Sequence, residues 1–204
     1  MNYDYADRAI RDLNKRNLRL FSKLKILKFD ELNILQTVTK VYDDSASIAK
    51  KRFKSIYADA YFEAFLLMEK KGKDPDDDIL EDWLLDMLED YDPVTHYRFN
   101  EETERKKSRT AEALVATKVD SKEVERALKL WTLQTDQYCD RAVVDGTLQA
   151  YKDNGVKYVR WETEKDDRVC IPCHELDGKI FKIEDVPPPQ HYRCRCRLIH
   201  IKDR

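Results

Sequence analysis

Apolar residues in the first part of the chain recur at alternating intervals of three and four. Asn17 is the one polar residue on this seam. A seam with that spacing predicts a helix over residues 3–29 with a coiled-coil-like stripe on one face. The apolar members of the seam are Tyr3, Ala6, Ile10, Leu13, Leu20, Leu24 and Leu27.

A second helix is predicted over residues 31–71, with Asp30 as its N-cap. The connection to the first helix is short, so the two should form a long antiparallel hairpin. The run Asp43, Asp44 and Ser45 is expected to kink or break this second helix, and Gly72 and Pro75 to end it.

Four aromatic residues of the second helix follow one another at i, i+4 spacing: Phe53, Tyr57, Tyr61 and Phe65. Such a row could be a stacking platform for bases, or it could be ordinary packing between helices. The pattern favours packing, because an aromatic stripe at helical spacing is typical of a buried face.

Further helices are predicted over residues 76–92, 100–116, 120–131 and 135–152. Asn100 and Asp120 are the expected N-caps of the second and third of these. Gly146 weakens the prediction that the last helix is continuous. Cys139 lies inside that helix and is interpreted as a small core residue.

Beyond Asn154 and Gly155 the pattern changes to short runs typical of strands, at residues 156–161, 179–183 and 195–201. The fold class predicted is therefore mainly α with a small C-terminal α+β module stabilised by zinc. We expect three regions: an N-terminal helical arm (1–95), a helical core region (96–155) and the C-terminal module (156–204).

The 204 residues include 38% charged residues and only four glycines, which suits solvated amphipathic helices. Net charge is −2, but its distribution is uneven: residues 8–28 are basic and residues 74–92 acidic. The C-terminus is basic through Arg193, Arg195, Arg197, Lys202 and Arg204. This asymmetry indicates contact with an acidic surface or with nucleic acid at one end, although the N-terminal run equally fits a solvated helix face.

The start of the chain is charged and lacks the apolar region of a secretory signal, and the apolar runs are too short for a membrane span. We therefore expect a protein made in a reducing cytoplasm. Clustered cysteines there favour a metal site over disulfides.

Candidate metal ligands gather in the last quarter of the chain. They are Cys170 and Cys173, in a Cys-x-x-Cys pair, and His191, Cys194 and Cys196. Thiolate and imidazole groups in two short clusters are the layout of a structural zinc site. Cys194 and Cys196, if on a strand, point to one face. Five candidates compete for four places, and a disulfide or reduced hairpin is the alternative.

The preferred set is Cys170, Cys173, His191 and Cys194, with Cys196 replacing Cys194 or His191 in the alternative. His174 is a sixth candidate, but its place directly after Cys173 makes double ligation awkward. Zinc here is expected to stabilise a small module rather than catalyse. The chain has no HExxH-type helix, and nothing in it requires an open metal position.

The segment W-x-T-x-x-D-D-R-V-C-x-x-C-x-x-L-D-G-K-I-F, followed by P-P-x-H-x-x-C-R-C-R-L, resembles the signature of the phage head morphogenesis family, the Mu F-like minor head proteins of tailed bacteriophages. The matching residues are Trp161, Thr163, Asp166, Arg168, Cys170, Cys173, Leu176, Asp177, Gly178, Pro188, His191, Cys194, Arg195 and Cys196. Tyr192 departs from the pattern, which has proline after the histidine.

The resemblance implies a minor capsid protein, not an enzyme, located in the virion head near the portal vertex. It implies partnership with the portal protein and other head proteins, and roles in head assembly and DNA passage. A basic C-terminus agrees with contact to packaged DNA. The alternatives are a zinc-containing nuclease using His174, His200 or His96, and a DNA-binding zinc module. None of these histidines lies in a recognisable nuclease motif.

Overall fold

The computed structural model describes residues 4–167, 169–189, 191 and 193–201. Five residues named above, Tyr3, Arg168, Tyr192, Lys202 and Arg204, lie outside the described residues. The elements are α1 (Asp4–Phe21), η1 (Ser22–Ile26), α2 (Glu31–Leu67), α3 (Asp77–Glu89), α4 (Phe99–Ala116), α5 (Ser121–Asp153), β1 (Tyr158–Glu162), α6 (Ile171–Leu176), β2 (Ile180–Lys182), η2 (Ile183–Asp185) and β3 (Arg197–His200). None of the described helices is apolar and long enough to span a bilayer.

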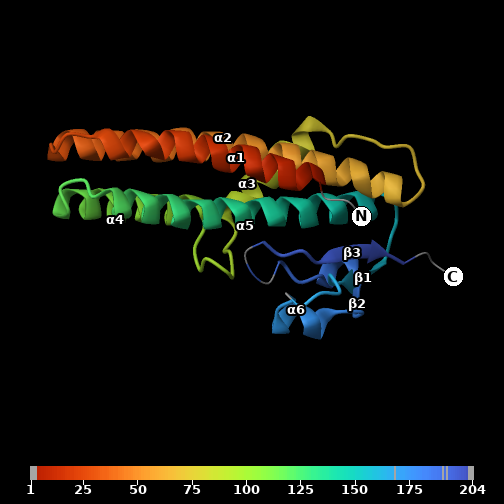
Figure 1. The fold of residues 1–204 in the computed structure, drawn as a ribbon. Coiled ribbons are helices and arrows are strands. Elements are labelled where there is room, and N and C mark those ends of the chain that lie inside the picture. The colour runs from red at the N-terminus through yellow and green to blue at the C-terminus, as the bar shows by residue number, and fades with distance from the viewer. Residues whose placement is uncertain (1–3, 168, 190, 192, 202–204) are drawn as a thin grey trace.

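The helices form two long layers (Figure 1). In the first, α1 and α2 lie side by side and run in opposite directions, which is the hairpin that the sequence predicts. Asp30 caps α2, its side chain accepting the Asn33 N–H at 2.8 Å. In the second layer, α4 leads into α5, which packs along α2.

Helix α2 continues unbroken through Asp43, Asp44 and Ser45, so the predicted kink is wrong. The reason is a buried polar contact. The Ser45 hydroxyl donates to the Asn17 side chain and accepts from the Trp131 indole N–H at 2.6 Å. Because the serine hydroxyl bonds to side chains of two other helices, it does not hydrogen-bond to the backbone of its own helix and disrupt it. The same contact explains the polar exception on the seam of α1, because Asn17 is fully buried.

Helix α5 is also continuous, where the sequence predicts two helices with a doubtful glycine. Gly146 faces the backbone of α2. A Cβ atom at this position would lie 2.4 Å from the carbonyl oxygen of Tyr57, far inside van der Waals contact. The glycine is therefore required by the close approach of two helices and is not a point of weakness.

The aromatic row of α2 is buried, with exposed fractions of 0% to 9%, which confirms the packing interpretation. Phe53 meets Phe99 edge-on at 5.7 Å between ring centroids, and Phe99 meets Tyr138 at 4.9 Å. Edge-to-face pairs of this kind add to simple apolar burial. The core of the helical body thus joins α2, α4 and α5 through aromatic side chains.

The N-cap predicted at Asn100 is wrong, because α4 begins at Phe99 with Arg98 as the cap. Burial of Phe99 in the core extends the helix toward its N-terminus. Asn100 instead accepts a hydrogen bond from Lys50 of α2 at 3.1 Å. The predicted cap at Asp120 is confirmed, with its side chain accepting the Lys122 N–H at 2.8 Å.

The C-terminal module contains a three-stranded antiparallel sheet in the order β2-β1-β3. Val159, Trp161 and Leu198 of this sheet pack against the ends of α2 and α5 in a second hydrophobic cluster. The Tyr151 hydroxyl of α5 donates to the Leu198 carbonyl at 3.1 Å. The module therefore lies against the end of the helical body (Figure 1).

The third strand starts later than predicted, so Cys194 and Cys196 precede β3 instead of lying in it. Arg193 adopts a positive φ of 58°. The Cys194 N–H bonds to Asp140 of α5. Both features take the backbone out of the sheet ladder before Arg197.

Replacing Gly146 with alanine tests the contact between α2 and α5. Alanine favours a helix over glycine by about 1 kcal/mol, yet we expect Gly146→Ala to lower the free energy of unfolding by about 1–3 kcal/mol because the helices must separate. Urea denaturation followed by circular dichroism measures the change. Lys129→Ala, an exposed site on the same helix, is the control and should be nearly neutral. A stabilised Gly146→Ala would contradict the close approach.

Candidate metal centre

Helix α6 positions the first pair of candidate ligands. Cys170 is its N-cap residue, and its sulfur accepts the Cys173 N–H at 3.4 Å. Pro172 in the first turn has no N–H to satisfy and so suits this position. This cap geometry turns the Cys170 sulfur back toward the first turn, where Cys173 lies.

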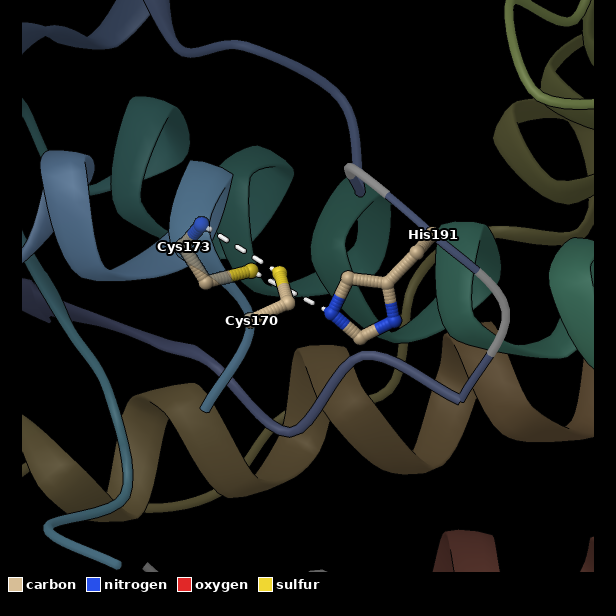
Figure 2. A group of neighbouring side chains, drawn as sticks. All are labelled: Cys170, Cys173 and His191. Carbon is tan, nitrogen blue, oxygen red and sulfur yellow. Dashed lines mark hydrogen bonds between the residues drawn. The ribbon is translucent and has the colours of Figure 1, made fainter. Parts of the chain in front are cut away.

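The second group of ligands comes from the segment between η2 and β3. His191 lies with its Nε2 atom 3.3 Å from the Cys173 sulfur. Figure 2 shows the imidazole ring directed at the two cysteines of α6. The Cys194 sulfur is 3.8 Å from that of Cys173. The structure thus brings together residues that are 18 and 21 positions apart.

The five predicted ligands form two overlapping groups, and Cys173 belongs to both. One contains Cys170, Cys173 and His191, the other Cys173, Cys194 and Cys196; in each, the ligand atoms lie within 4.8 Å of one another. Zinc–sulfur bonds of about 2.3 Å in a tetrahedron place neighbouring sulfurs about 3.8 Å apart. The observed separation of Cys173 and Cys194 matches that edge. Each group supplies three of the four donors of a tetrahedral site, and the cluster is compatible with a metal ion.

Two other predicted residues stay outside both groups. His174 is exposed on α6. Cys139 is fully buried in the helical core, as predicted, and belongs to neither ligand group. The choice between Cys194 and Cys196 stays a prediction, since both sulfurs are near Cys173.

The pKa values of two cluster thiols, Cys173 and Cys194, are raised. Burial, with the neighbouring Cys194 thiol, raises the pKa of Cys173 to about 12. The pKa of Cys194 is also raised, first by its contact with the Cys196 side chain and then by burial. The raised pKa values favour the protonated thiols of Cys173 and Cys194, so a bound metal would have to displace these protons.

Residues flanking the cysteines in the motif hold the module together. The Asp177 carboxylate accepts the Thr163 N–H at 2.8 Å, and this bond lowers the pKa of Asp177. Gly178 takes a positive φ of 75° and donates its N–H to the Trp161 carbonyl at 2.8 Å. These residues fix the turn after α6 against the end of β1, which explains why they accompany the cysteines.

Sequence reasoning missed two carboxylates of α5 that hold the ligand segment. Asp140 accepts the Cys194 N–H at 3.1 Å. Asp136 is fully buried and binds both Arg193, at 2.8 Å, and Asn14 of α1, at 3.1 Å. The sequence does contain a signal for them: two acidic residues at i, i+4 spacing on either side of the apolar residues Tyr138 and Cys139 indicate carboxylates on one face of the helix.

The basic residues of the described C-terminal segment are paired within the chain. Arg193 bonds to Asp136, and Arg195 makes a bidentate pair with Asp166 at 2.7 and 2.8 Å. Arg197 pairs with Glu164. These pairs compete with any contact to phosphate, although the Arg193 side chain remains 65% exposed.

Residues 105–199 match the model of a family described as Phage Mu protein F like protein. The match covers just under half of the chain, from within α4 to the penultimate residue of β3, and includes all five candidate ligands. This part of the chain is similar to the Mu F-like proteins, and the similarity supports a phage head morphogenesis family. Searches of curated proteins and of solved structures gave no match.

The link between Asp140 and Cys194 can be tested by removing the acceptor. Asp140→Ala leaves a half-buried N–H without its partner, and we expect a loss of about 1–3 kcal/mol in the free energy of unfolding. Asp140→Asn keeps an acceptor oxygen and should lose less. Hydrogen exchange at the Cys194 amide gives the local readout. Unchanged exchange in Asp140→Ala would show that the bond does not hold this segment.

Proposed function

We propose that this protein is a minor structural protein of a phage head that docks at the portal vertex and acts in head assembly and DNA passage. The similarity of residues 105–199 to the Mu F-like family supports the head protein class. The observation that carries the finer proposal is the convergence of five thiol and imidazole groups in a small module at the end of a long helical body. A rigid module on a long arm suits docking to a partner.

The module is proposed to bind one structural zinc ion through Cys170, Cys173, His191 and Cys194, with Cys196 as the alternative to one of the last two. The fit of the sulfur separation supports zinc, as does the softness of the donors. Zinc would supply folding energy by joining α6 to the segment before β3. The excess of donors over four leaves one thiol outside the coordination sphere.

We also propose that the module, residues 156–204, is a unit distinct from the helical regions 1–95 and 96–155. Its sheet has a hydrophobic cluster of its own, shared only with the ends of α2 and α5. The two helical regions share the main core, so they should unfold together. If the regions are divided in this way, loss of the metal should unfold the module and leave the helical regions folded.

Contact with DNA is proposed through the exposed parts of the C-terminal arginines, and contact with the portal through the module. No observation favours the nuclease alternative: His174 lies outside both ligand groups, and His200 packs its ring 5.5 Å from that of Tyr151. We therefore propose a structural role without catalytic activity.

Co-expression with the portal protein of the same phage tests the docking role. We expect co-purification of the two proteins with about one zinc ion per chain of this protein. The His174→Ala variant is a useful companion, because it should behave as the wild type. Metal-dependent DNA cleavage that disappears in His174→Ala would instead establish the nuclease alternative.

Cys170→Ser tests the metal site. We expect loss of zinc and unfolding of the residues after Gly155, while the helical body stays folded because its core lies elsewhere. Zinc analysis and hydrogen exchange resolved along the chain measure both effects. Cys139→Ala is the matched control and should retain zinc. Full zinc content in Cys170→Ser would refute the ligand assignment.

The fourth ligand is decided by comparing Cys194→Ser with Cys196→Ser. We expect the larger loss of zinc affinity from Cys194→Ser, because the Cys194 sulfur lies at the tetrahedral edge distance from Cys173 and its backbone is held by Asp140. Competition with a chromophoric chelator measures the affinity. A larger loss from Cys196→Ser would exchange the two roles.

A further inference from the structure

The outer face of α1 carries a row of like charges. Arg11, Lys15 and Arg19 follow one another at i, i+4 spacing, and all three are exposed. Leu18 lies beside the last of them and is 54% exposed. Lys23 continues the basic row into η1.

The outer face of α3 carries the same pattern with the opposite sign. Asp78, Asp82 and Asp86 are exposed and spaced i, i+4. Leu85 lies in the position that corresponds to Leu18 and is 61% exposed. Glu89 extends the acidic face by one more turn.

Each row weakens its own helix, because like charges at i, i+4 spacing repel. The helix dipole favours Asp78 in the first turn of α3 and Arg19 in the last turn of α1, but it does not account for the residues between. Within the described residues, no ion pair neutralises these six side chains, whereas nearby Asp12 pairs with Arg16 and Arg52. The rows therefore indicate a partner of opposite charge.

We propose that the α1 face of one copy of this chain docks on the α3 face of a second copy. The charged rows 11–19 and 78–86 have the same span, about 12 Å of helix. With the two helices parallel, the three cations lie opposite the three carboxylates, and Leu18 and Leu85 flank the charged rows on opposite sides of the contact. The charges give the contact its selectivity, and each leucine adds apolar area beside the charged rows.

The two faces belong to different surfaces of the molecule. Helix α1 packs on α2 and α5, whereas α3 packs on α2 and α4. A contact between unlike surfaces is head-to-tail, and its repetition gives a ring or an open chain. A single pair of helices is smaller than a standard interface, so the free protein should associate weakly. Copies gathered at one assembly site would associate more strongly, because their effective concentration is higher.

Charge reversal followed by mixing tests this contact. One variant carries Lys15→Glu, Arg19→Glu and Lys23→Glu, and the other carries Asp82→Lys, Asp86→Lys and Glu89→Lys. Asp78 is left in place because it stabilises the first turn of α3. Sedimentation at low ionic strength should show each variant alone as a monomer. Their mixture should associate, because each then offers the other a complementary face.

A matched pair of leucine variants gives an independent readout. We expect Leu85→Ser to weaken the association of the wild type by roughly tenfold, with unchanged helix content. Leu130→Ser, at a 43% exposed leucine of α5, should leave it unchanged. Added salt should weaken the wild-type association, because exposed charges are screened.

Three results would overturn the proposal. The first is a wild-type protein that remains monomeric at about 200 µM in low salt, well above the weak range expected for a small interface. The second is a mixture of the reversed variants that stays monomeric although both keep wild-type helix content. The third is binding of duplex DNA or an acidic peptide to the basic row of α1 in the absence of any self-association. The test uses this chain alone, so portal docking and zinc binding can fail or succeed independently.

Discussion

The close contact between α2 and α5 organises the molecule. At Gly146 the two helices approach so closely that a single added carbon would meet the Tyr57 carbonyl. Helix α5 continues through this contact without a break, over Ser121–Asp153. One face of α5 can then contribute Trp131 and Tyr138 to the core while Asp136 and Asp140 reach the ligand segment. The position of the candidate metal centre depends on this helix.

The sequence predicts the helices because their apolar periodicity is local, and it predicts the ligand cluster because Cys-x-x-Cys and Cys-x-Cys spacings are local too. The continuity of α2 and α5 was not predictable in the same way. Ser45 and Gly146 are unfavourable in an isolated helix, and each becomes favourable only through a residue on another helix, Trp131 or Tyr57. The role of Asp140 likewise depends on a contact 54 residues away.

The late start of β3 also depends on a contact between residues that are distant in the sequence. A strand over residues 195–201 satisfies the local pattern, but a carboxylate of α5 takes the Cys194 N–H. Cys194 and Cys196 still end near Cys173, although by a loop and not by strand alternation. The predicted outcome, two sulfurs on the same side, was therefore reached by a different local geometry.

The two halves of the candidate centre differ in how the chain supports them. Arg193 and Cys194 are tied to the helical body by Asp136 and Asp140, so contacts with α5 support that half. Helix α6 has Cys173 as its only buried residue, with Leu176 packed against the second hydrophobic cluster, and the turn at Asp177 and Gly178 follows it. A metal ion that joins Cys173 to the supported half would therefore act chiefly on α6. The module would then gain rigidity at α6, where few of its residues are buried, as small domains stabilised by a structural metal do.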